Sequence, residues 1–148
     1  MTVEFLAGDL FDSPAQTLAH GVNCEGRMGA GIAVEFRRRF PAMYQECRRR
    51  CHHRILQPGD LFLWDRGEPW VLNLATQAGA GGATEEYVDR CIERLASDYQ
   101  LMGIRSIAMP RIAAGLRGLS WPWVRSRLVE KLGPIELGVC VYELYSRQ

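Results

Sequence analysis

The sequence predicts an α/β domain in which a largely parallel sheet is covered by helices on both faces. Short apolar runs alternate along the chain with longer segments of helical periodicity. The connections between most of these runs are long enough to be helical crossovers, which join parallel strands. The 148 residues, 47% of them hydrophobic, suffice for one core and leave little room for two, so we expect a single domain over residues 1–148.

Six apolar segments are expected to be strands, because each is short and bounded by glycine, proline or polar residues. The third and fourth flank an expected turn at residues 66–68, which favours an adjacent strand pair. The last is rich in β-branched and aromatic residues. The expected strands are residues 3–6, 17–22, 61–64, 70–74, 106–109 and 138–144.

Four helices are expected between these strands. The first begins near Ile32, and Pro41 ends it and opens the second. The third follows Thr84 and stops at Gly103, and Ser120 is placed to cap the fourth. A flexible glycine-rich stretch is expected over residues 76–82, before the third helix.

Composition and charge argue against several functional classes. No window reaches the roughly 18 apolar residues that a membrane span needs, and the start of the chain is too short and too charged for a signal peptide. We therefore expect a cytoplasmic protein with no membrane partner. The formal net charge of +1 gives no global case for nucleic acid. Arginines cluster at 37–39, 48–50 and 54, where a solvated helix face is favoured over a nucleic-acid surface.

The five cysteines are an odd number and do not suggest a disulfide framework. Cys47 and Cys51 would share one face of a helix and, with His52 and His53, could be read as zinc ligands. Small thiols on the inner face of a helix are more simply core residues. We expect no metal and no cofactor, and, because no heptad or extra apolar stripe is present, a monomer.

Two glycine-rich segments follow expected strands and precede expected helices, at residues 26–31 and 115–118. Glycine allows the backbone to approach a ligand and to turn its N–H groups inward. A helix N-terminus adds partial positive charge, so the two segments together could hold a diphosphate at the carboxyl ends of the strands. The sequence lacks a G-K-[ST] motif, which argues against a P-loop ATPase.

Four polar residues near these segments have both a structural and a functional interpretation. Asp9 could bind an adenine amino group or a ribose hydroxyl, or could cap a turn. Asn23 could contact a ligand or form an Asx-turn. His20 lies within an apolar strand, where a core histidine is favoured over a catalytic one. Glu25 is the nearest carboxylate on the first loop and could be catalytic or merely exposed.

Four motifs in this order resemble those of a macrodomain over almost the whole chain. They are GDLF at residues 8–11, HGVN at 20–23, RMGAGIAV at 27–34 and MPRIAAGL at 109–116. The resemblance is strongest to the branch with terminal ADP-ribose protein glycohydrolases, antitoxins that remove ADP-ribose from DNA, and ADP-ribose-1″-phosphatases. It implies a three-layer α/β/α fold, with a mixed and largely parallel central sheet, and a cleft for ADP-ribose.

The resemblance also implies roles for individual residues. Asp9 would hold the adenine amino group, Leu10 would border it, and Asn23 would contact the distal ribose and is the candidate catalytic residue. Tyr142 and Leu144 fall where the last strand borders adenine. The distal ribose and the diphosphate would be lined by Met28, Gly29, Ala30, Gly31 and Ile32. The second phosphate loop would consist of Ile112, Ala113, Ala114, Gly115, Leu116 and Arg117, and Thr76 and Gln77 would also contact the ligand.

Two departures from the family pattern bear on catalysis. Gln77 stands where the related glycohydrolases have a lysine, and Arg117 stands where the protein glycohydrolase has an aspartate. A neutral amide cannot form a Schiff base, and arginine does not lose its proton at neutral pH. The resemblance thus implies ADP-ribose binding, with hydrolysis of ADP-ribosylated protein or nucleic acid without a covalent lysine. A non-catalytic ADP-ribose reader and an ADP-ribose-1″-phosphate phosphatase are the alternatives.

Overall fold

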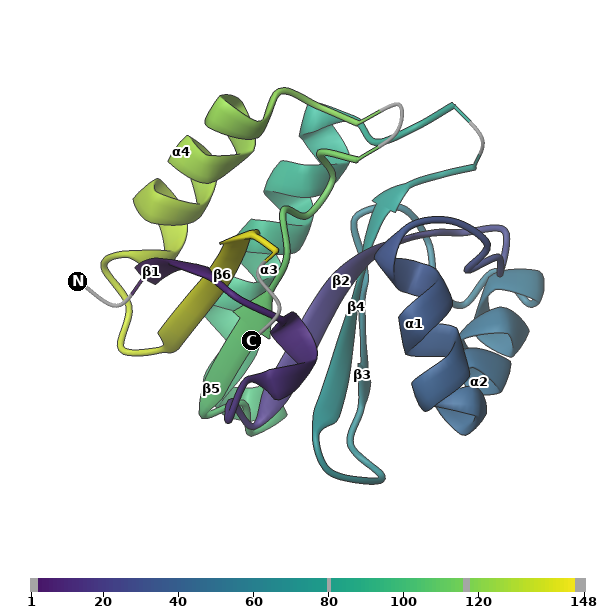
Figure 1. The fold of residues 1–148 in the computed structure, drawn as a ribbon. Helices are drawn as coiled ribbons and strands as arrows, with labels where there is room; N and C mark the ends of the chain where they lie inside the picture. Colours follow the sequence, from purple (N-terminus) through teal and green to yellow (C-terminus); the bar gives the residue numbers. More distant parts are fainter. Residues whose placement is uncertain (1–2, 80, 116–117, 146–148) are drawn as a thin grey trace.

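Six strands form one mixed sheet in the order β1-β6-β5-β2-β4-β3 (Figure 1). The structure is a computed structural model and describes residues 3–79, 81–115 and 118–145. All neighbouring strands are parallel except β3 and β4, which are antiparallel. The strands are β1 (Val3–Ala7), β2 (Thr17–Asn23), β3 (Leu61–Trp64), β4 (Trp70–Gln77), β5 (Ser106–Met109) and β6 (Gly138–Leu144).

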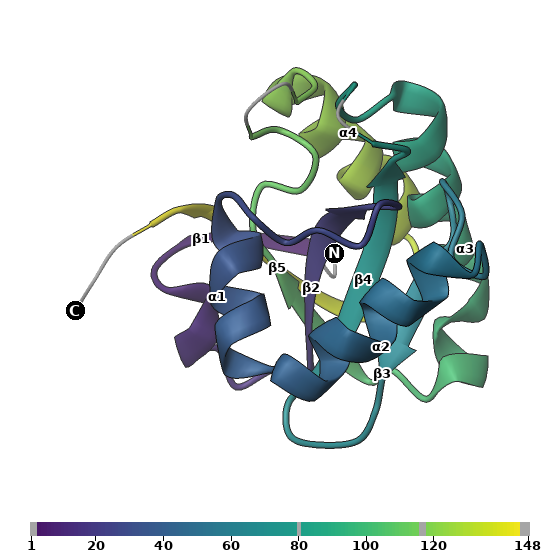
Figure 2. The ribbon, with the colours of Figure 1, turned by 90° about the vertical axis from the view of Figure 1, so that its right-hand side faces the viewer.

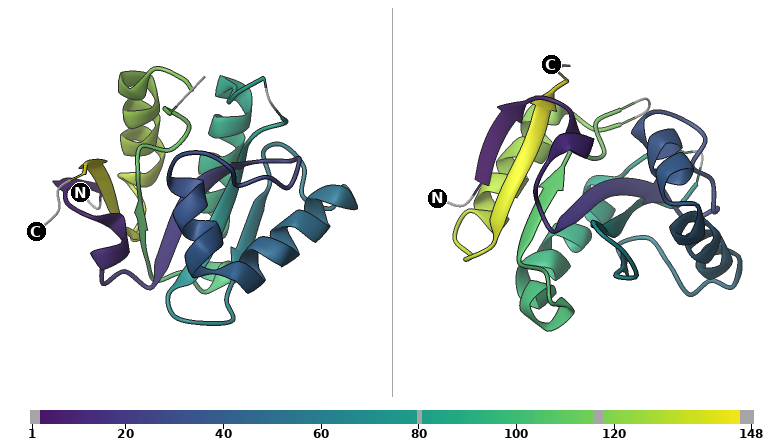
Figure 3. Two further views of the ribbon diagram at one scale, coloured as in Figure 1. Left: turned by 45° about the vertical axis from the view of Figure 1, so that its right-hand side comes forward. Right: turned by 60° about the horizontal axis from the view of Figure 1, so that its bottom comes forward.

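Helices cover both faces of this sheet, so the α/β/α layering implied by the sequence is confirmed. Helices α1 and α2 lie on one face, toward the viewer in Figure 2, and α3 and α4 lie on the other (Figures 1 and 3). A short 3₁₀ helix, η1, follows β1. The helices are η1 (Leu10–Asp12), α1 (Ile32–Arg39), α2 (Pro41–His52), α3 (Glu85–Met102) and α4 (Trp121–Leu132).

The helix ends follow local sequence signals in most cases. The Thr84 side chain accepts a hydrogen bond from the Tyr87 amide at 3.2 Å and caps α3. Gly103 ends this helix in the left-handed conformation, with φ of 80°. The expected cap of α4 is only partly right, because Ser120 occupies the N-cap position but its side chain makes no capping hydrogen bond.

Each face of the sheet has its own apolar core. On one side, residues of α3 and α4 such as Val88, Leu95 and Leu128 pack with sheet residues such as Leu72 and Ile107. On the other side, the core consists of α1 and α2 residues with side chains from β2, β3 and β4, among them Phe36, Met43, Cys47, Leu18 and Phe62. Cys47 and Cys51 are buried on the inner face of α2, as expected for core thiols.

Two central strands extend further than predicted, which is a correction with consequences for the site. Strand β2 includes Asn23, and β4 continues to Gln77 instead of ending at Leu74. The added residues pair in register, since Val22 lies beside Ala75 and Asn23 beside Gln77. The first two residues of the stretch expected to be flexible are thus part of the sheet. Strand β1 likewise runs one residue past its predicted end.

The parallel strands β2, β4 and β5 place their carboxyl ends at the same edge of the sheet. The loop from β2 to α1 and the loop from β5 to α4 both begin at this edge, shown at the top of Figure 1. Both glycine-rich segments are therefore brought to one end of the molecule. Within the described residues, no helix is long and apolar enough to cross a membrane.

Candidate functional site

Two adjoining pockets lie along this edge of the sheet. The wide pocket has a volume of about 540 Å³ and lies between η1, α1 and the end of β6. The narrow pocket has a volume of about 210 Å³ and lies between the two glycine-rich loops, above β2 and β4. Ile32 and Pro110 line both pockets, so the two form one groove across the strand ends.

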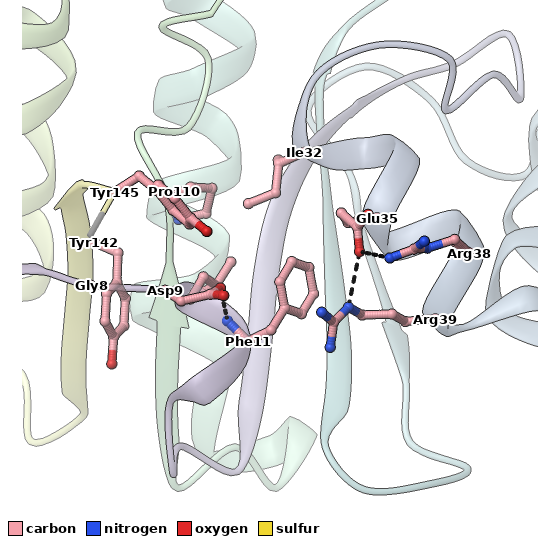
Figure 4. Close-up of a pocket in the computed structure, with 11 residues that line it drawn as sticks. Gly8, Asp9, Phe11, Ile32, Glu35, Arg38, Arg39, Pro110, Tyr142 and Tyr145 are labelled. Carbon is pink, nitrogen blue, oxygen red and sulfur yellow. Dashed lines mark hydrogen bonds and ion pairs between the residues drawn. The ribbon is translucent and has the colours of Figure 1, made fainter. Parts of the chain in front are cut away.

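The wide pocket has an acidic group between aromatic side chains (Figure 4). Asp9 caps η1, because its Oδ1 accepts a hydrogen bond of 3.0 Å from the Phe11 amide. Tyr142, Tyr145 and Phe11 also line this pocket. A Cβ on Gly8 would lie 3.2 Å from the Tyr142 ring, so the tyrosine packs closely against backbone here. The second carboxylate oxygen of Asp9 can accept a hydrogen bond from a planar ligand held between these rings.

The opposite wall of the wide pocket is a charged face of α1. Glu35 pairs with Arg38 at 2.9 Å and with Arg39 at 3.1 Å, and these contacts lower the pKa of its carboxyl group. The Arg39 guanidinium also lies 4.3 Å from the centre of the Phe11 ring. Sequence reasoning missed this wall by treating the arginines as a solvated face. The signal was their spacing, since Glu35 and Arg39 share a helix face with Ile32.

The narrow pocket is bordered by backbone suited to bind an anion. Gly31 precedes α1 with φ of 60° and ψ of −146°, and no side chain caps this helix. The first amides of a helix have no acceptor within it, so those of Ile32 and Ala33 at the start of α1 can donate to a ligand. Across the pocket, Ala113 adopts φ of 60°, which is unusual for a residue with a side chain. A Cβ on Gly31 or Gly115 would meet no atom within 4 Å.

The structure brings together many of the residues that the sequence placed at the ligand. Leu10 is buried beside Asp9 in the wide pocket. Leu116 and Arg117 lie outside the described residues. The wide pocket contains Asp9, Leu10, Ile32 and Tyr142, and the narrow pocket contains Ala30, Gly31, Ile32, Thr76, Gln77, Ile112, Ala113 and Gly115.

Other predicted residues do not line either of these two pockets: Asn23, Met28, Gly29, Ala114 and Leu144. Met28 is 3% exposed and packs in the core beneath α1 and α2. Leu144 is 60% exposed at the end of β6. Asn23 accepts hydrogen bonds from the amides of Glu25 and Arg27 and donates one to the Arg27 carbonyl, so its side chain braces its own loop.

His20 is a core residue, as the sequence favoured. Its Nε2 lies 2.8 Å from Asn73 Oδ1, and its ring stacks on Phe36 with centroids 3.9 Å apart. Complete burial lowers the pKa of His20 to about 4, so the ring is neutral at physiological pH. His20 does not line either pocket of the groove.

All five cysteines are free thiols, three of them buried and two half-buried. Burial raises the pKa of Cys24 and of Cys91 to about 12, which keeps these thiols protonated. Cys47 and Cys51 lie on the buried face of α2. Across the described part of the chain, no three histidine, cysteine or acidic side chains converge closely enough to hold a metal ion.

Comparison with known proteins agrees with this architecture. The Macro domain family model matches residues 19–128. A DNA ADP-ribosyl glycohydrolase of Thermus aquaticus is 36% identical over 147 residues, which are 95% of this chain and 41% of that protein. A DNA ADP-ribosyl glycohydrolase of Mycobacterium tuberculosis is 30% identical over 132 residues, which are 86% of this chain and 38% of that protein. The chain therefore spans about two fifths of the length of these relatives.

Solved structures show the same fold. The macrodomain of Thermus aquaticus DarG has a TM-score of 0.89 at 35% identity, over 95% of this chain and 97% of that one. Thermosipho africanus DarTG, solved in complex with ADP-ribose, has a TM-score of 0.89 at 26% identity, over 99% of this chain and 42% of the other. The sheet order, the two glycine-rich loops and the extent of the family match lead to one conclusion: the chain belongs to the macrodomain family.

Proposed function

We propose that the groove binds ADP-ribose and that the protein hydrolyses the bond joining ADP-ribose to a macromolecule. The continuity of the two pockets carries this proposal, because a single ligand would need an aromatic and acidic subsite at one end and an anion-binding subsite at the other. The Thermosipho africanus relative was solved with ADP-ribose, a ligand that has this arrangement of groups.

The sheet order gives the ligand a direction. The wide pocket lies at the β6 side of the groove and would take the adenosine, with Asp9 accepting from the adenine amino group and Tyr142 beside the ring. The loops around Gly31 and Ala113 would take the diphosphate. The distal ribose would then lie toward β4, near Thr76 and Gln77, and the attached macromolecule would leave the groove there.

The chemistry cannot involve a covalent lysine in this groove. The only lysine in the sequence is Lys131, in the last turn of α4, where it lies 3.8 Å from Glu93. We propose direct attack of water on the anomeric carbon of the distal ribose, with the leaving group taking a proton as the glycosidic bond breaks. A substrate phosphate would position the water, and the amide-rich loops would stabilise the charge.

A non-catalytic ADP-ribose reader is the second candidate, and one observation favours it. Both ends of the Asn23 amide are bonded within its own loop, and the side chain does not line the narrow pocket. In that case Asn23 would shape the loop and would not act on substrate.

Turnover distinguishes the two candidates. We would incubate the protein with an ADP-ribosylated DNA oligonucleotide and with an ADP-ribosylated protein, since curated relatives are named DNA ADP-ribosyl glycohydrolases. If Asn23→Ala lowers the rate of ADP-ribose release more than it lowers affinity for the substrate, the result would support the enzyme. Tight binding without release, with only affinity changed in Asn23→Ala, would support the reader.

The proposal also covers the cellular compartment and the oligomeric state of the protein. We propose that the protein acts in the cytoplasm, which its five free thiols favour because reduced cysteines are typical of that compartment. We also propose that it acts as a monomer on ADP-ribosylated nucleic acid or protein. Size-exclusion chromatography with light scattering would test the oligomeric state, and a dimer would contradict it.

A further inference from the structure

Three of the five cysteines gather where the β2–α1 loop meets α2. Cys47 and Cys51 lie one helical turn apart on the buried face of α2. Cys24 follows β2 directly and packs, half-buried, against the same apolar core. These thiols line neither pocket of the groove, and the described residues around them do not converge on a metal site. The proposed function therefore leaves this cluster unexplained.

The β2–α1 loop packs directly on α2 on both sides of Cys24. Before it, the Asn23 carbonyl accepts a hydrogen bond of 3.8 Å from the Cys51 thiol. After it, Gly26 adopts φ of 79°, and a Cβ there would lie only 3.1 Å from Arg48 Cγ. The Asn23 carbonyl belongs to the peptide unit that leads into Cys24, so the Cys51 sulfur lies at most about 7 Å from the Cys24 Cα. A small movement of the loop brings the two thiols within bonding reach.

The surroundings of the thiols give them different reactivity. The Cys47 thiol donates a hydrogen bond to the Cys51 sulfur, which lowers the pKa of Cys51. Burial raises the pKa of Cys24 to about 12, so Cys24 stays protonated. The thiolate is the form that reacts with an oxidant, which makes Cys51 the first sulfur to react. Because Cys51 is only 6% exposed, the oxidant must be as small as hydrogen peroxide.

We propose that hydrogen peroxide joins Cys24 to Cys51 in a reversible disulfide, which fastens the β2–α1 loop to α2. The Cys51 thiolate attacks one peroxide oxygen and the O–O bond breaks. The departing hydroxide takes up the proton that Cys51 had released, which leaves water and a Cys51 sulfenic acid. The Cys24 sulfur then attacks the Cys51 sulfur, the S–O bond breaks, and hydroxide leaves as water with the Cys24 proton. Two thiols thus lose two electrons, and one peroxide becomes two waters.

The disulfide would restrain the loop that leads to Gly31 without touching the groove itself. It would close a loop of chain from residue 24 to residue 51 and should raise the melting temperature by about 5–10 °C. A dithiol reductant should reverse the rise, because it exchanges with the disulfide. This modification goes beyond the proposed function and does not depend on ADP-ribose binding.

Peptide mapping after oxidation tests the proposal. The reduced protein is treated with hydrogen peroxide, the remaining thiols are blocked with iodoacetamide, and a tryptic digest is analysed by mass spectrometry without reduction. Trypsin places Cys24, Cys47 and Cys51 in separate peptides, which are residues 1–27, 40–48 and 51–54. Cys24→Ser and Cys51→Ser remove one partner each. Cys140→Ser is the matched control, because Cys140 is also a half-buried thiol but lies on β6.

We expect a peptide 1–27 linked to 51–54, together with the higher melting temperature, in wild type and in Cys140→Ser. Both should be absent in Cys24→Ser and in Cys51→Ser. Cys47→Ala should form the link several-fold more slowly, because the Cys51 sulfur loses its hydrogen-bond donor. Peroxide treatment that yields no such linked peptide, or that links residues 40–48 instead, overturns the proposal. A linked peptide without a higher melting temperature also overturns it, because the bond would then join a distorted state of the loop.

Discussion

The buried His20 makes the stability of the fold depend on pH in a defined window. Burial lowers the pKa of His20 from 6.5 to about 4. The ring therefore resists protonation in the folded protein but is readily protonated in the unfolded chain. Above pH 6.5 the ring is neutral in both states and does not affect stability. As the pH falls from 6.5 toward 4, only the unfolded state gains the proton, and stability is lost.

The size of this loss of stability follows from the pKa shift of His20. One pKa unit corresponds to about 1.4 kcal/mol, so the complete loss amounts to about 3 kcal/mol, of which about 2 kcal/mol occurs between pH 7 and pH 5. Acidic groups that are held ionised by arginines contribute at lower pH. Glu46, for example, has a pKa of about 2 because Arg49 and Arg50 donate to it, and it remains charged at pH 5.

Urea unfolding at pH 7 and pH 5 measures this difference. His20→Gln removes the titration and can still donate a hydrogen bond to Asn73, so its stability should change much less between the two pH values. His52→Gln alters an exposed histidine and serves as the matched control. Equal wild-type stability at both pH values, or a loss that persists in His20→Gln, would refute the assignment of the effect to this ring.

Three further predictions concern the groove. Gly31→Val should abolish detectable ADP-ribose binding in calorimetry, because it adds bulk to a residue that lines the narrow pocket. It should also lower stability by about 1–3 kcal/mol, because φ of 60° disfavours a β-branched residue. Asp9→Asn should weaken AMP binding about 10-fold with little change in melting temperature, since the amide oxygen can still cap the Phe11 N–H while its NH₂ group cannot accept from adenine. Glu143→Gln should weaken ADP-ribose binding several-fold and leave AMP binding unchanged. The Glu143 carboxylate accepts hydrogen bonds from Trp121 and Arg125 in the first turns of α4, the helix that follows the glycine-rich loop after β5. Glu130→Gln, on the same helix, is the control and should bind both ligands as wild type does.

The fold was largely predictable because its signals are local. Thr84 and Gly103 delimit α3 by capping and by a left-handed residue, and Pro41 separates α1 from α2. The glycine-rich loops were also visible in the sequence, since they lie between an apolar strand and an amphipathic helix. The parallel order of the strands then brings both loops to one edge.

The site was less predictable because its details depend on contacts between distant segments. The direction of the Thr76 side chain depends on a register shift between β2 and β4, which no local pattern shows. Arg39 becomes part of the groove because η1 places Phe11 opposite α1. Met28 lies in a glycine-rich motif yet is buried in the core. Motif position alone cannot separate a residue that touches a ligand from one that supports the loop, as Asn23 also shows.

We propose that one groove binds the adenosine, the diphosphate and the distal ribose of ADP-ribose together. Calorimetric titration of the purified protein with ADP-ribose, with AMP and ribose 5-phosphate as separate ligands, tests it most directly. We expect one-to-one binding of ADP-ribose that is at least about 100-fold tighter than binding of either fragment, a difference of about 2.7 kcal/mol. Failure to bind ADP-ribose, or binding no tighter than AMP, would contradict the claim.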